Sequence, residues 1–173
     1  MREALLPFFE WYAGTALSRV MSGSSTLIEV AQIVHLIGMT LLIGTIMMVD
    51  LTLLGCGIKR QPAARVASEL APWTLGGLAI MLVTGPLNLA SEAMRCYDSS
   101  FFWVKMGLLA VTLIFHFTVH RRVVGAEPPV SKFQAGLVGC VSLALWFGIA
   151  LAAKFIAFYG EDLRQQAGLF TNY

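Results

Sequence analysis

Three histidines stand in otherwise apolar stretches of this sequence, where an imidazole ring could ligate a metal or line a path for an ion. His35 lies in IVHLIGMTLLIGTIMMVDL, residues 33–51, which also contains Asp50, and the other two are His116 and His120. The spacing of four residues puts both rings of the second pair on one face of a helix. An ionisable group in an apolar helix is expensive to bury and usually faces a bundle interior or a bound group. Metal ligation and ion permeation are the chemistries that these residues favour.

Haem b is the cofactor that the histidines indicate most strongly, because paired histidines on facing helices hold b-type haem. His35, or His116 with His120, would be the iron ligands. His35 should lie near one membrane surface and His116 near the other, with depths that differ by more than about 10 Å at a rise of ~1.5 Å per residue. One iron would then need a non-histidine axial ligand or a histidine from a second copy of the chain.

Other polar residues in the apolar stretches extend this set. His35 and Asp50 are fifteen positions apart, so they share a broad helix face but not a depth. Asp50 should reach the depth of the histidine pair. A hydrogen-bonded cluster of Asp50, His116 and Arg121 is one interpretation, and solvation of Asp50 and His120 by water at the membrane surface is the other. The expected intramembrane polar cluster comprises Asp50, Asn88, Lys105, Thr112 and Lys154, of which Lys154 could instead extend to the surface.

Other ligand sets are weaker. The methionines of MSG, GMT and IMMV could bind Cu(I), but thioethers more often fill apolar cores. The three cysteines are isolated and form no CxxC pair, so we expect free thiols. The sequence contains no pattern typical of a catalytic triad, a phosphate loop or an HExxH helix. We therefore expect no metal site apart from haem, and no catalysis by this chain alone.

Four long apolar stretches must position these residues, and they indicate an integral membrane protein. Of 173 residues, 57% are hydrophobic and 13% are charged, against roughly 25% charge in soluble domains. Apolar runs of about 20 residues cross a bilayer as helices. We expect spans at about 27–54, 72–90, 101–120 and 133–159. The predicted fold is all-α, an up-down four-helix bundle over residues 26–173.

Residues 1–25 form a separate unit before the first span. PFFEWYAGTALSRVM mixes four aromatic residues with one acid and one base, which is typical of the membrane interface. We expect a short amphipathic helix on the membrane surface, followed by an SGSS turn that caps the first span. An arm that binds a protein partner is the alternative.

The basic residues of the two span-connecting linkers predict the orientation. They are Lys59, Arg60 and Arg65 in the first linker, and Arg121, Arg122 and Lys132 in the second. Basic short loops stay in the cytoplasm, so both termini should lie on the periplasmic side of a bacterial inner membrane. The net charge of +2 then requires no nucleic-acid partner. The expected partners are the lipid bilayer and either a second copy of the chain or another membrane subunit.

Several longer motifs resemble an uncharacterised family of small bacterial four-span membrane proteins. They are EVAQIVHLIGMTLLIGTIMMVDLTLLG, LAPWTLGGLAIMLVTGPLNLASEA, FFWVKMGLL with HFTVHRR, and LALWFGIALAAKFIAF. The resemblance covers about residues 11–158 and implies a fold and a membrane location, without an activity. Its motif positions here are Glu29, His35, Asp50, Pro72, Trp73, Gly85, Arg95, Lys105, His116 and Trp146. The first two motifs are also distantly similar to copper-resistance-D and cytochrome b561-like membrane proteins, which implies haem or copper.

Three functions stay open at this point. The first is a small membrane subunit that binds haem b and exchanges electrons with a partner. The second is a cofactor-free accessory or anchoring subunit of a membrane complex, in which the buried polar residues orient the bundle. The third is a permeation protein for a metal or another ion. Its path would be lined by His35, Asn88, Lys105, Asp50 and His116.

Overall fold

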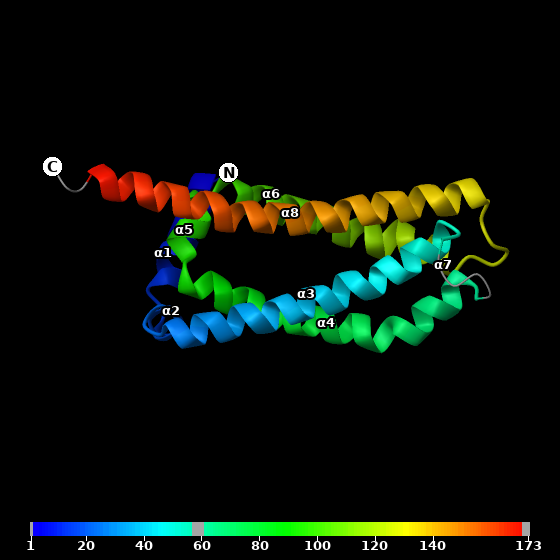
Figure 1. The fold of residues 1–173 in the computed structure, drawn as a ribbon, viewed down its shortest axis with the longest axis horizontal. Coiled ribbons are helices and arrows are strands. Elements are labelled where there is room, and N and C mark those ends of the chain that lie inside the picture. The colour runs from blue at the N-terminus through cyan, green and yellow to red at the C-terminus, as the bar shows by residue number, and fades with distance from the viewer. Residues whose placement is uncertain (1, 57–60, 171–173) are drawn as a thin grey trace.

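The computed structural model describes residues 2–56 and 61–170, and the side chains of residues 3–156 within these ranges. The described chain forms an all-helical bundle with four helices long and apolar enough to cross a membrane (Figure 1). Three of these spans are α3 (Ser25–Leu53), α4 (Ala63–Ser91) and α8 (Lys132–Phe170). The remaining span begins as α6 (Ser100–Phe115) and continues through η1 (His116–His120) and α7 (Arg121–Val124). The predicted all-α membrane bundle is confirmed.

The spans differ from their expected bounds mainly on α4 and α8. The start of α4 lies at Ala63 instead of Pro72, because Pro62 adopts the extended backbone of an N-cap and good helix formers follow it. Pro72 therefore lies inside the helix, where its ring removes one backbone hydrogen bond without ending the helix. At the other end of the chain, α8 continues to Phe170, past the expected end at residue 159. Hydropathy marks the part of a helix in the membrane, and helices continue beyond it.

The N-terminal unit consists of two helices where one was expected, α1 (Arg2–Ala13) and α2 (Ala16–Ser22). Thr15 separates them, because its backbone is extended and its hydroxyl accepts a hydrogen bond from the Ser18 N–H at 3.2 Å. Such a hydroxyl satisfies a free N–H at a helix start. Ser24 caps α3 in the same way, as the SGSS turn predicts.

The N-terminal unit packs onto the bundle. The Phe9 ring of α1 is 4% exposed and lies against rings of α5 (Ala93–Asp98) and α6, with centroids 5.4 Å from Tyr97 and 5.8 Å from Trp103. The buried hydroxyl of Ser18 on α2 donates to the Ala90 carbonyl of α4 at 2.7 Å. These contacts attach the unit to one end of the bundle, while the Trp11 ring stays exposed, as in an interfacial helix.

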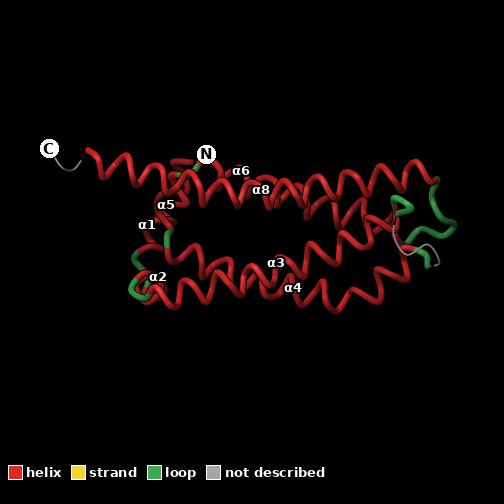
Figure 2. Tube along the Cα trace, in the orientation of Figure 1, coloured by secondary structure: helices red, strands yellow, loops and turns green. Residues whose placement is uncertain are grey.

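The bundle has two distinct ends, where the connections gather (Figure 2). We call the end with α1, α2 and α5 the terminal end, and the end with α7, which carries Arg121 and Arg122, the basic end; Lys59 and Arg60 of the first linker lie outside the described residues. The C-terminal part of α8 also lies at the terminal end (Figure 1). α3 packs against α4 and α8, and α6 packs against α8.

Two features of the middle of the bundle position the polar residues. Gly38 and Gly77 let α3 and α4 approach closely, because a Cβ on Gly77 would lie only 2.9 Å from the Gly38 carbonyl oxygen. An apolar core formed by Leu42, Ile46, Trp146 and Ile149 joins α3 to α8. This core separates the polar residues of the terminal end from those of the basic end.

Candidate functional site

At the basic end, Asp50 and His120 form a buried hydrogen-bonded pair. Asp50 Oδ1 lies 2.6 Å from His120 Nε2, and the two residues are 0% and 3% exposed. The other carboxylate oxygen, Oδ2, is buried without a hydrogen-bond partner in the described chain. Gly139 of α8 lets that helix cover Asp50, since a Cβ there would lie 3.0 Å from the Asp50 carbonyl oxygen. The pair is therefore a hydrogen bond between a carboxyl group and an imidazole in the low-dielectric interior.

His116 extends this pair by ring stacking. The His116 and His120 rings have centroids 4.9 Å apart and planes 23° apart, so the expectation that they share one face is confirmed. His116 Nδ1 is buried and has no hydrogen-bond partner among the described residues. We call Asp50, His116 and His120 the acid–histidine cluster. Its composition corrects both sequence interpretations, because Asp50 bonds to His120 and not to His116, and neither Asp50 nor His120 is solvated at a surface.

A local π-helix explains this arrangement. In η1 the Arg121 N–H donates to the His116 carbonyl, a step of five residues instead of the four of an α-helix. The extra residue in the turn changes the direction in which the following side chains point, and His120 becomes buried against Asp50. Single π turns within α-helices often occur at functional sites. The π turn therefore lies between the two histidines of the acid–histidine cluster.

A cavity of about 470 Å³ lies beside the acid–histidine cluster, between α3, α4 and the η1–α7 segment. Volumes of this order hold small ligands. Its α3 and α4 walls are mostly apolar, and its η1–α7 wall carries the ionisable groups. The lining residues are Ile46, Val49, Ala64, Ala67, Ser68, Ala71, Thr74, Leu75, His116, Phe117, His120, Arg121, Val124 and Gly125.

His35 belongs to a second polar group at the terminal end. Its Nδ1 lies 2.7 Å from Thr84 Oγ1, and the Thr84 hydroxyl also lies 2.7 Å from the Ile80 carbonyl oxygen. Because the hydroxyl has one proton and donates it to Ile80, Nδ1 of His35 must be the donor to Thr84. The ring also packs on Gly85, where a Cβ would lie 3.8 Å from Cε1. His35 Nε2 is therefore the nitrogen left for another partner.

Lys105 and Asn88 complete the polar groups at the terminal end. Lys105 of α6 interacts electrostatically with both His35 and Cys96. Burial raises the pKa of the Cys96 thiol, and the charge of Glu92 raises it further. Asn88 has a buried side-chain oxygen without a hydrogen-bond partner in the described chain.

The remaining predicted residues lie outside both groups. Thr112 is 1% exposed and donates to the Leu108 carbonyl of its own helix at 2.7 Å. The Lys154 side chain on α8 is exposed. Besides the partners of His35 and Asp50, sequence reasoning missed the hydrogen bond of 2.9 Å from the Thr74 hydroxyl to Thr45, which joins two spans. Two hydroxyls in facing apolar helices are a weak signal, because each can bond to its own backbone.

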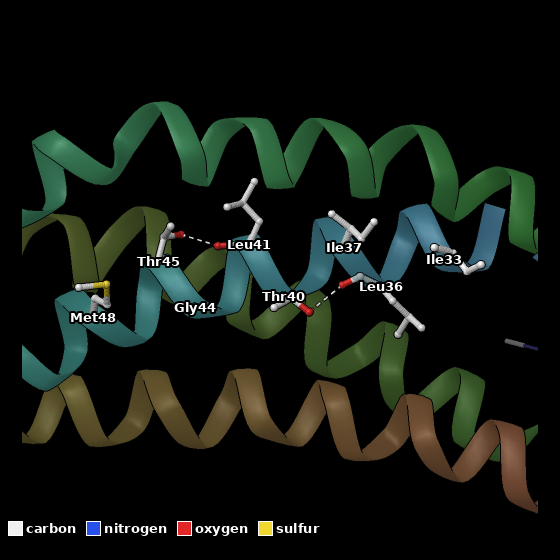
Figure 3. Close-up of a pocket in the computed structure, with 8 residues that line it drawn as sticks. All are labelled: Ile33, Leu36, Ile37, Thr40, Leu41, Gly44, Thr45 and Met48. Carbon is white, nitrogen blue, oxygen red and sulfur yellow. Dashed lines mark hydrogen bonds between the residues drawn. The ribbon is translucent and has the colours of Figure 1, made fainter. Parts of the chain in front are cut away.

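A second hollow, an open groove of about 560 Å³, follows one face of α3 and lacks reactive groups (Figure 3). The residues drawn in Figure 3 all belong to α3, and none of them is ionisable. Its hydroxyls bond within the helix, Thr40 to the Leu36 carbonyl and Thr45 to the Leu41 carbonyl, each at 2.9 Å. The groove is an apolar helix surface, and the cavity at the basic end is the candidate site.

The comparisons with known proteins place the chain in a family without a described function. Residues 8–159, most of the chain, match the model of a family described as a family of unknown function, DUF6644. No curated protein and no solved structure matches the chain. Function must therefore be argued from the cavity and the two polar groups.

Proposed function

The chain belongs to the family of unknown function DUF6644, and we propose that this multi-pass membrane protein is a permeation protein that moves protons, with the acid–histidine cluster as its ionisable site. The buried Asp50–His120 pair is the observation that carries the proposal. An ionisable residue that is buried in a membrane helix is costly, and it usually faces the bundle interior and has a function. Buried carboxylate and imidazole groups in membrane spans are typical of proton relays.

The free atoms of the cluster give the proton a route into and out of the pair. Asp50 Oδ2 and His116 Nδ1 are both buried without a hydrogen-bond partner in the part of the chain that the structure describes. The stacked His116 ring also lines the cavity at the basic end. A proton that enters the cavity can reach His120, which lines it, and the hydrogen bond between His120 and Asp50 then connects it to the carboxylate, whereas transfer from His116 to His120 requires a bridging water.

Towards the terminal end, polar pairs continue along the contact between α3 and α4. Thr45 bonds to Thr74, and His35 bonds to Thr84, on either side of the Gly38–Gly77 contact. The close helix contact interrupts the row, so proton movement along it requires local separation of α3 and α4 and bridging water. The proposal thus places the path from Thr45 to His35 along this contact, whereas the acid–histidine cluster joins α3 to η1.

Proton flux into liposomes tests this function. With a pH-sensitive dye inside the vesicles and a valinomycin-clamped potassium potential, the wild-type protein should acidify the lumen well above the rate of empty vesicles. Asp50→Asn should lower the protein-dependent rate at least tenfold, because an amide fits the space of a carboxylate but cannot take up and release the proton.

The matched control for the flux assay is Glu29→Gln, an exposed acid near the start of the same helix, which should keep the wild-type rate. A wild-type rate equal to that of empty vesicles would refute proton permeation. If Asp50→Asn acidified the lumen at the wild-type rate, the acid–histidine cluster would not be part of the proton path.

Haem b binding stays a prediction and is the second candidate, because the buried His116 Nδ1 has no hydrogen-bond partner within the described ranges. Axial ligands bind iron from opposite faces of the porphyrin. Two stacked rings cannot do so, and a haem here would take one of them and a second ligand from elsewhere. The purified protein should then show a Soret band that His116→Ala weakens strongly. A colourless, iron-free preparation would reject haem binding by the isolated chain.

The location and the partners follow from the same features. We propose a bacterial inner membrane, with the basic end in the cytoplasm, because basic residues of short linkers are retained there. The termini would then lie on the periplasmic side. A second copy of the chain or another membrane subunit is the proposed protein partner. An accessory role in a complex is the alternative if the isolated chain conducts no protons.

A further inference from the structure

The cavity at the basic end is larger than a proton path requires. A water molecule occupies about 30 Å³ in the liquid, whereas the cavity has a volume of about 470 Å³. From its two unlike walls we propose that it binds an anionic amphiphile, with an oxyanion headgroup against Arg121 and the histidines and an alkyl chain along α4. This inference goes beyond proton permeation and does not depend on it.

The apolar wall fits an alkyl chain. Ala64, Ala67 and Ala71 of α4 are three and four residues apart, so they lie on one helix face. Their small side chains leave the space that the cavity occupies, and Ile46 and Leu75 extend the same wall. An alkyl chain gains free energy when it is buried against such a surface.

The opposite wall fits an anion. Arg121 lines the cavity, is always protonated, and has no acidic partner among the described residues. His116 also lines the cavity, its buried Nδ1 has no hydrogen-bond partner among the described side chains, and Arg121 interacts electrostatically with its ring. A guanidinium beside an imidazole can hold a carboxylate or a phosphate through charge-assisted hydrogen bonds.

The acids near the cavity do not cancel this positive wall. Asp50 does not line the cavity, and His120 stands between the two because its Nε2 bonds to the carboxylate. Glu69 of α4 is exposed and pairs with Arg65 at 3.0 Å. The walls of the cavity therefore present one fixed positive charge, from Arg121, and no carboxylate.

Binding of defined lipids to the full chain tests the inference. The probes are oleate as a carboxylate, phosphatidylglycerol as a phosphate, and phosphatidylcholine as a zwitterionic reference, added to purified protein in neutral detergent and counted by native mass spectrometry. We expect saturable binding of one anionic lipid per chain, at least tenfold tighter than phosphatidylcholine. Preference for oleate or for phosphatidylglycerol identifies which oxyanion the site takes.

Two variants separate the cavity from general surface charge. Arg121→Gln should weaken anion binding at least tenfold, whereas Arg122→Gln, an exposed arginine that does not line the cavity, should leave it unchanged. Ala67→Leu should weaken binding by filling the apolar wall without a change in charge. Equal losses in the two arginine variants, or equal affinity for all three lipids, would overturn the inference. Neither outcome bears on proton flux, so the two proposals fail separately.

Discussion

His120→Leu should destabilise the bundle by about 3–5 kcal/mol, because it leaves the Asp50 carboxylate buried without its partner. Asp50 is 0% exposed, so no water can replace the lost hydrogen bond of 2.6 Å without a rearrangement of the helices. The free energy of unfolding can be measured in mixed micelles by titration with a denaturing detergent and followed by circular dichroism. We expect a large drop in that free energy for this single substitution.

The double variant Asp50→Leu/His120→Leu separates charge from packing. With no charge left to bury, it should recover most of the stability that the single substitution loses. If the single and the double variants are equally unstable, the cost is one of packing, and the pair is not a buried acid–imidazole contact.

Glu69→Ala is the matched control on the surface. It breaks the Arg65–Glu69 pair, whose side chains are 65% and 53% exposed. Exposed pairs contribute at most about 1 kcal/mol, so the free energy of unfolding should change little. If Glu69→Ala lowered the free energy of unfolding as much as His120→Leu, the titration would not distinguish buried pairs from exposed pairs.

Much of the fold can be predicted from hydropathy, charge and spacing. Apolar runs of sufficient length give the four spans, and Ser24 at the first of them is an N-cap by its residue type. The four-residue spacing of His116 and His120 predicts their shared face, and the position of Asp50 at the far end of its span predicts its depth. The spans, the cap and the depth depend on regular helix geometry, and the two histidines share a face although a π turn lies between them.

The partner of Asp50 could not be predicted, because it depends on a departure from regular geometry. Counting 100° per residue through the third span assumes an α-helix, whereas η1 contains a π turn between His116 and His120. One extra residue per turn rotates the following side chains away from the counted positions. Nothing in the residue types of HFTVH distinguishes a π turn from an α turn, so neither interpretation of the sequence paired His120 with Asp50.

The cavity was also beyond sequence reasoning, for a different reason. A void depends on which small residues of one helix face which side chains of another. Ala67 and Ala71 leave space only because the η1–α7 segment packs opposite them with its histidines directed inward. In another pairing of the spans the same alanines would allow close helix contact, as Gly38 and Gly77 do.

Alanine substitutions at two adjacent glycines of α4 should change the free energy of unfolding in opposite directions, because only one of the two glycines contacts α3. A Cβ on Gly77 would lie 2.8 Å from the Leu42 backbone nitrogen and 2.9 Å from the Gly38 carbonyl oxygen, and backbone atoms cannot rotate away. Gly77→Ala should therefore force the helices apart and cost about 1–3 kcal/mol or more. At Gly76 a Cβ meets nothing within 4 Å, so Gly76→Ala should be neutral or gain up to about 1 kcal/mol of helix propensity.

The same unfolding titration distinguishes the two variants, and Gly76→Ala is the control for any general effect of alanine in α4. The Gly77 substitution has a further consequence, because Thr45–Thr74 and His35–Thr84 both bridge α3 and α4. A forced separation should lengthen these hydrogen bonds, whereas the Asp50–His120 pair joins α3 to η1 and should persist. If the two alanine variants unfold with the same free energy, α3 and α4 do not meet at Gly77 in the membrane. The row of polar pairs along their seam would then lose its geometric basis.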